Sequence, residues 1–115
     1  MSTHYLNIIT RNIAELEDIL QHNNDIDTTL KTVLNSIRGM QDYYTKFLEG
    51  SDSSKNPKEH QILSHISKAK VLLAKGKNQL RLYKSKNENN FLNGFQITTK
   101  EALKNLYEVK VLLDQ

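Results

Sequence analysis

The sequence contains no cysteine and no tryptophan, and it has only one proline and four glycines in 115 residues. Without cysteine the chain can form no disulfide and no thiolate metal site, and it has no cysteine nucleophile. So little proline and glycine is untypical of a protein built from short strands and turns. Because Leu, Ile and Val recur at helical spacing, we expect an all-α fold.

Long apolar runs are missing as well. The longest one spans four residues, 71–74, so the sequence predicts no membrane span. No basic-then-apolar signal peptide opens the chain, and we therefore expect a cytoplasmic protein, with export by a signal-independent route left open. The length suits one helical domain, residues 1–115, with a single core.

Apolar residues at alternating three- and four-residue steps run through the first twenty positions. This is the a/d pattern of a helix that buries one seam against other helices. The pattern then meets two polar residues, Asn23 and Asp27, and resumes at Leu30. The members of this first stripe are Leu6, Ile9, Ile13, Leu16 and Leu20.

The polar interruption leaves two interpretations open. Either one helix runs from 3 to 49, or the chain breaks near 22–24 and a second helix begins at about 25. We favour the break, because an Asn-Asn-Asp cluster offers N-cap chemistry at that point. Two helices, 3–22 and 25–49, predict a closed bundle. One long helix would instead give an extended helical hairpin that needs a partner to cover its seam.

The clearest predicted loop is the small, polar segment 50–56. It leads into Asn56, Pro57 and Glu59, which together form a strong helix-start signal. The apolar stripe behind them predicts a helix over 57–84. Gly76 lies on that stripe, and we interpret it as a tolerated glycine rather than as the site of a close helix crossing.

The segment 85–97 is rich in asparagine and contains Gly94, which predicts a second loop. The sequence from Thr98 to Glu101 has the form of a capping box and predicts a last helix over 98–114. The expected architecture is therefore a small antiparallel bundle of three to four helices, at 3–22, 25–49, 57–84 and 98–114.

Charge is distributed unevenly between the two halves of the chain. Residues 1–54 hold four basic and eight acidic side chains, whereas residues 55–115 hold twelve basic and five acidic ones. Glu15 and Glu17 flank the seam of the first helix on opposite sides. We expect these acidic flanks to pair with basic flanks on the third helix, within one molecule or between two.

The basic flanks lie between residues 60 and 87, where there are seven basic side chains and no acidic one. At about 100° per residue, three of them fall on one side of the apolar stripe and three on the other. Charges that straddle a seam are typical of helix pairing, whereas a groove-binding helix gathers its charges on one face. The seven residues are Lys68, Lys70, Lys75, Lys77, Arg81, Lys84 and Lys86.

Residues that could catalyse a reaction or hold a metal are scattered. His60 and His65 are five residues apart on different helix faces, and no HExxH or HxxxH motif occurs. The serines at 51–54 lack a glycine-flanked nucleophile elbow, and the glycines are too isolated for a phosphate loop. We therefore predict no enzymatic activity, no metal and no cofactor.

The sequence thus predicts a non-catalytic helical interaction module, such as an adaptor, a secretion or assembly chaperone, or a small subunit of a complex. Its partner would be another protein, or a second copy in a homodimer. The alternative is a nucleic-acid-binding protein that uses the basic segment 68–86. Tyr43, Tyr44 and Phe47 could together form an exposed aromatic anchor for binding, although a core role for Tyr44 and Phe47 is favoured. The candidate partner-binding residues are Lys68, Lys70, Lys75, Lys77, Arg81, Lys84, Tyr43 and Phe47.

Overall fold

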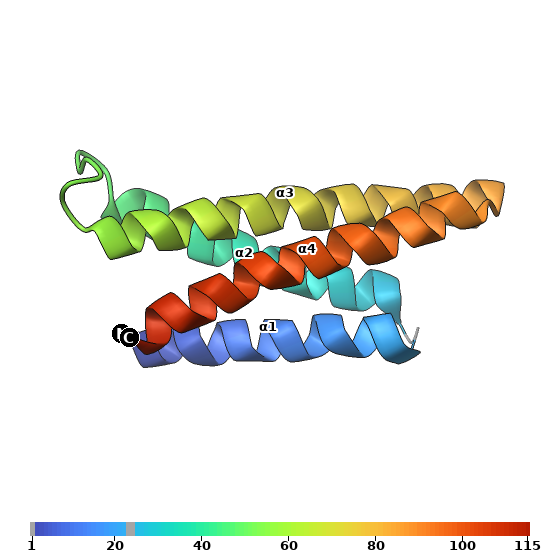
Figure 1. The fold of residues 1–115 in the computed structure, drawn as a ribbon, viewed down its shortest axis with the longest axis horizontal. Helices are drawn as coiled ribbons and strands as arrows, with labels where there is room; N and C mark the ends of the chain where they lie inside the picture. Colours follow the sequence, from blue (N-terminus) through green and yellow to red (C-terminus); the bar gives the residue numbers. More distant parts are fainter. Residues whose placement is uncertain (1, 23–24) are drawn as a thin grey trace.

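The structure, a computed structural model, describes residues 2–22 and 25–115, and these form an all-helical bundle (Figure 1). This confirms the predicted all-α class. Within the described residues there are four helices, and consecutive helices run in opposite directions (Figure 1). Their bounds are α1 Ser2–His22, α2 Ile26–Phe47, α3 Pro57–Lys86 and α4 Asn89–Asp114.

The four helices form a closed ring in which each helix packs on two others. Both α1 and α3 pack on α2 and on α4, so α1 and α3 occupy opposite corners. In Figure 1, α1 lies along the lower edge and α3 along the upper edge, while α4 crosses in front and α2 crosses behind. A helix of 30 residues is about 45 Å long, which accounts for the 48 Å length of the molecule.

The opposite-corner arrangement corrects one prediction. Acidic flanks on the first helix cannot pair with basic flanks on the third helix of the same molecule, because α2 and α4 separate the two. Glu17 instead accepts a hydrogen bond from the Tyr107 hydroxyl on α4, at 2.6 Å. Lys84 on α3 pairs with Asp27 on α2. The sequence alone could not say which helices become neighbours in the ring.

The favoured interpretation of two separate helices is confirmed, and the alternative of one long helix over 3–49 is wrong. The structure shows α1 ending at His22 and α2 beginning at Ile26, while Asn23 lies outside the described residues. Of the predicted cap cluster, Asn24 also lies outside the described residues, and the prediction is wrong for Asp25. Asp25 has a left-handed backbone (φ 47°), and its side chain makes no capping hydrogen bond. Its carbonyl oxygen accepts a hydrogen bond from the Thr29 amide at 3.0 Å.

The buried face of α1 is wider than the predicted stripe. Ile9, Ile13 and Leu16 are buried as the stripe requires, whereas its outer members are only partly buried. Two residues outside the stripe, Asn12 and Ile19, are also buried. The reason is that α1 packs on two helices at once, which covers a broader surface than a two-helix seam.

The predicted loop at 85–97 is wrong, since α4 begins at Asn89 and only two residues separate it from α3. Tertiary packing overrides the local asparagine and glycine content. Phe95 is buried against Gly76 on α3: a Cβ atom placed on Gly76 would lie 3.5 Å from the Phe95 ring and 3.5 Å from the Thr99 hydroxyl. Gly76 therefore stands at a helix contact where an alanine would still fit.

The predicted capping box at 98–101 is wrong for the same reason. Thr98 and Thr99 lie inside α4, and both are buried. The start of α3 agrees better with the sequence, because the helix begins at Pro57 as predicted. The Asn56 side chain makes no capping hydrogen bond, however, and its backbone is left-handed (φ 53°).

Candidate functional site

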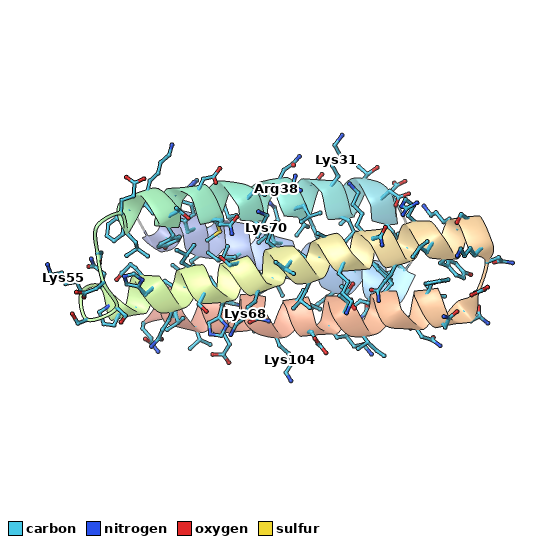
Figure 2. All side chains as sticks on the ribbon, turned by 90° about the horizontal axis from the view of Figure 1, so that it is seen from above. Lys31, Arg38, Lys55, Lys68, Lys70 and Lys104 are labelled. Carbon is cyan, nitrogen blue, oxygen red and sulfur yellow. The ribbon has the colours of Figure 1, made fainter. Side chains whose placement is uncertain are left out.

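The basic side chains of α3 do not form one continuous face. Figure 2 shows Lys68 on the side of α3 that faces α4, and Lys70 on the side that faces α2. Lys70 is half-buried. The remaining members, all exposed, are Lys68, Lys75, Lys77, Arg81, Lys84 and Lys86. The structure therefore distributes these charges around α3.

Two of the predicted binding residues are engaged within the molecule. Lys84 forms the ion pair with Asp27, and the Arg81 guanidinium donates a hydrogen bond to the Asn78 side chain at 2.7 Å. Lys77, Asn78, Arg81 and Asp27 also line one depression of about 320 Å³. Because Asp27 contributes a carboxylate there, the positive charge of this depression is partly neutralised.

A shallow and more apolar groove lies between α3 and α4. It has a volume of about 530 Å³, and no residue of α1 or α2 lines it. Val71 forms its apolar floor together with Leu72, and 66% of the Val71 surface is exposed. Lys68 and Glu101 lie at the groove with opposite charges, and Ser67 and Asn105 complete the lining. We call this feature the α3–α4 groove.

Sequence reasoning missed the α3–α4 groove. The signal in the sequence was Val71, an apolar residue off the helical stripe and between basic neighbours. Its meaning depends on which helix lies beside α3, since Glu101 and Asn105 come from α4. Beside the groove, the His65 ring and the Asn105 side chain form a hydrogen bond of 2.9 Å between the two helices.

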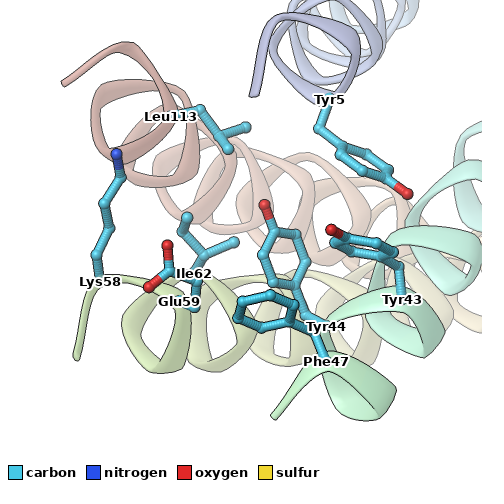
Figure 3. Close-up of a pocket in the computed structure, with 8 residues that line it drawn as sticks. All are labelled: Tyr5, Tyr43, Tyr44, Phe47, Lys58, Glu59, Ile62 and Leu113. Carbon is cyan, nitrogen blue, oxygen red and sulfur yellow. The ribbon is translucent and has the colours of Figure 1, made fainter. Parts of the chain in front are cut away.

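A second concave site lies where all four helices meet at one end of the bundle (Figure 3). Its volume is about 300 Å³. Figure 3 shows aromatic rings on the side of α1 and α2, and charged side chains on the side of α3. We call this feature the aromatic pocket. Its lining residues are Tyr5, Tyr43, Tyr44, Phe47, Lys58, Glu59, Ile62 and Leu113.

The rings of the aromatic pocket are in contact with one another. The Tyr43 ring centre lies 4.8 Å from that of Tyr5 and 5.0 Å from that of Tyr44. Phe47 stacks on Tyr43 at 6.2 Å. Such separations are typical of stabilising aromatic pairs. The sequence could show three of these residues close together on one helix, but not that Tyr5 completes the group.

Burial differs between the members of this group. Tyr44 is buried, as its predicted core role requires, whereas the same prediction for Phe47 is wrong because half of its surface is exposed. Burial raises the pKa of the Tyr44 hydroxyl to about 12, and the nearby Tyr43 and Glu59 add to the rise. Burial and Tyr43 likewise raise the pKa of Tyr5. The pocket therefore disfavours additional negative charge.

The two charged side chains of the pocket are not paired with each other. The Lys58 ammonium donates a hydrogen bond to the backbone carbonyl of Gln115 at 3.2 Å. Within residues 2–22 and 25–115, the half-buried carboxylate of Glu59 has no ion-pair partner.

Histidine and carboxylate side chains do not gather at one point. Across the described part of the chain, no group of three such side chains could hold a metal ion. His60 contacts the Ser51 hydroxyl at 3.3 Å, and His65 contacts Asn105, so the two point to different partners. None of the described helices has an apolar stretch long enough to cross a membrane.

Comparison with known proteins gives no match. No protein-family model, no curated protein and no solved structure is detectably similar to this chain. Its function must therefore be inferred from the grooves, charges and exposed residues of the bundle itself.

Proposed function

We propose that this protein is a non-catalytic interaction module that binds an amphipathic helix of another protein in its α3–α4 groove. The observation that carries the proposal is the exposed apolar floor of that groove, where Val71 is two-thirds exposed and the lining includes no residue of α1 or α2. An apolar groove between two helices is a common receptor for the apolar face of a third helix.

The charges at the groove favour a helix with both signs of charge. Lys68 would attract an acidic residue on the incoming helix, and Glu101 would attract a basic one. Such rim pairs contribute little affinity, but they select one orientation of the partner. The binding energy itself would come from burial of Val71 and Leu72, at roughly 25 cal/mol for each Å² of apolar surface covered.

The proposal is tested by placing a photo-crosslinking residue, p-benzoylphenylalanine, at position 71 in the native host. We expect crosslinks to an amphipathic helical segment of one partner. The matched control is the same residue at position 111, because Val111 is also exposed on a helix but does not line the groove. Equal capture from both positions would contradict the proposal.

A second arm uses the purified complex. Val71→Asp should weaken partner binding by at least tenfold, since it places a charge on the apolar floor. Val111→Asp should leave binding unchanged. Both positions are exposed, so both variants should melt within a few degrees of the parent protein, as circular dichroism would show. If Val71→Asp bound the partner normally, the groove would not be the binding site.

The competing candidate is a nucleic-acid-binding protein that uses the basic residues of α3. The depression that contains both Lys77 and Arg81 favours it, since two cations there lie one helical turn apart. Such binding would fall steeply as salt rises from 50 to 200 mM, and it would be lost in a Lys77→Glu, Arg81→Glu variant. A fluorescence titration with labelled duplex and single-stranded DNA or RNA at these two salt concentrations distinguishes the candidates.

A further inference from the structure

The aromatic pocket combines aromatic rings with a carboxylate, whereas the lining of the α3–α4 groove contains no aromatic residue. Rings from two helices enclose one side of it, and a carboxylate from a third helix lies on the other (Figure 3). The rings and the carboxylate are close enough to interact, since the Glu59 charge contributes to the raised pKa of Tyr44. A volume of about 300 Å³ is at the small end of ligand pockets.

These features match the requirements of an organic cation. The face of an aromatic ring carries negative electrostatic potential and attracts a cation placed over it. A quaternary ammonium group fits this chemistry well, because its methyl groups are apolar and it has no N–H that needs a hydrogen-bond acceptor. The unpaired Glu59 carboxylate supplies a full negative charge opposite the rings.

Lys58 also lines the pocket and opposes a cation there. Its ammonium group is hydrogen-bonded to the Gln115 carbonyl oxygen, and in Figure 3 it lies at the outer edge, beyond Glu59 as seen from the rings. The two charged residues therefore have opposite effects on a bound cation, and this can be tested. Removal of the Glu59 charge should lower the affinity for the cation, and removal of the Lys58 charge should raise it.

We propose that the aromatic pocket is a binding site for a small quaternary ammonium group, held between the rings of Tyr44 and Phe47 and the carboxylate of Glu59. A choline head group and a trimethylated lysine side chain share this chemistry. The site is distinct from the α3–α4 groove, because the two have no lining residue in common. Failure of the proposed helix binding in the groove would therefore leave this proposal unaffected, and the converse also holds.

The test is a titration of the full chain with tetramethylammonium chloride, monitored by the NMR shift of the methyl protons and by tyrosine fluorescence. Three of the five tyrosines line the pocket and there is no tryptophan, so most of the fluorescence comes from residues at this site. We expect saturable binding with an upfield methyl shift. Neutral tert-butanol, which has a similar shape, should bind at least tenfold more weakly. Choline and Nε-trimethyllysine, titrated separately, identify which carrier of the group fits.

Charge variants decide the outcome. Glu59→Gln should weaken tetramethylammonium binding about tenfold, and Lys58→Met should strengthen it a few-fold. Glu108→Gln, an exposed carboxylate on α4 that lines neither the aromatic pocket nor the α3–α4 groove, is the matched control and should bind like the parent protein. If Glu59→Gln lowers the melting temperature, Phe47→Leu provides a second test at a half-exposed position. It measures the contribution of the aromatic rings to binding. Equal binding of tert-butanol, or loss of affinity in Lys58→Met, would overturn the proposal.

Discussion

Asn12 on α1 donates a hydrogen bond from its side-chain amide to the Ser36 hydroxyl on α2, at 3.2 Å. Asn12 is fully buried, and its side-chain carbonyl oxygen has no hydrogen-bond partner. A buried amide whose carbonyl oxygen has no hydrogen-bond partner lowers the free energy of unfolding. This pair is therefore better explained as a device for specificity than as a source of stability.

At each of the four seams of the ring, where two neighbouring helices pack together, a hydrogen bond joins a side chain of one helix to a side chain of the other. Each one joins a different pair of neighbouring helices, so that every helix takes part in two. Besides Asn12 and Ser36 between α1 and α2, the pairs are Gln41 with Ser67 (α2–α3), His65 with Asn105 (α3–α4) and Tyr107 with Glu17 (α4–α1).

The Asn12–Ser36 pair predicts an asymmetry between two substitutions. Ser36→Ala should lower the free energy of unfolding by about 1–2 kcal/mol, because it leaves the buried amide of Asn12 without a partner. Adding Asn12→Leu in that background should restore most of the loss, since the apolar side chain needs no partner. Urea denaturation of the parent and of the single and double variants measures this. Additive losses in the double variant would contradict the interpretation.

The width of the buried face on α1 predicts a second contrast. Leu16 is fully buried, so Leu16→Ala should destabilise the bundle by about 2–5 kcal/mol. Leu20 belongs to the same sequence stripe but is only partly buried, so Leu20→Ala should cost less than half as much. Both variants are compared by urea denaturation. If the two losses were equal, the stripe in the sequence would describe the core better than the structure does.

The glycines predict gains as well as losses. Nothing lies within 4 Å of a Cβ placed on Gly39, so Gly39→Ala should stabilise α2 by about 1 kcal/mol. Gly76→Ala should be neutral or stabilising, because its Cβ would make only ordinary contacts. Gly50→Ala is the contrasting control. It should destabilise the protein, since Gly50 has a left-handed backbone with φ 75°. Thermal unfolding of the three variants tests the order.

Tyr44 predicts a dependence of stability on alkaline pH. Its pKa is raised from 10.0 to about 12, so between these values the unfolded chain loses its proton first. The folded state then binds more protons than the unfolded state, and stability falls as pH rises from about 10 to 12. Chemical denaturation across this range should show a shallower fall for Tyr44→Phe. Absorbance at 295 nm should show a tyrosine ionisation near pH 12 in the parent protein that is lost in Tyr44→Phe.

The sequence predicted most of the architecture from helical spacing. The positions of α1, α2 and α3 follow from apolar stripes and from the Asn56–Pro57 start, and helix patterns of this length are robust. The start of α4 could not be found in this way. Asn and Gly residues at 89–94 favour a loop locally, whereas burial of Phe95 against Gly76 on another helix favours a helix.

The candidate sites were harder to predict than the helices, because each one combines residues from separate helices. The basic residues were visible in the sequence, yet their local pairing with Asp27 and Asn78 was not. In the sequence neither Tyr5 nor Glu59 indicated a binding site, and only the meeting of α1, α2 and α3 brings them together. Helical periodicity shows which face of a helix is apolar, but not which other helix supplies the second half of a pocket.

The hydrogen bonds at the seams also bear on the handedness of the ring. A four-helix ring can turn clockwise or anticlockwise with the same neighbours and the same short connections, so apolar stripes alone hardly distinguish these two mirror-related topologies. Asn12 and Glu17 lie about 140° apart around α1, and they face α2 and α4 respectively. In the opposite topology, α2 and α4 would exchange sides, and the buried Asn12 would face away from Ser36. The unsatisfied amide would then penalise the mirror-related fold.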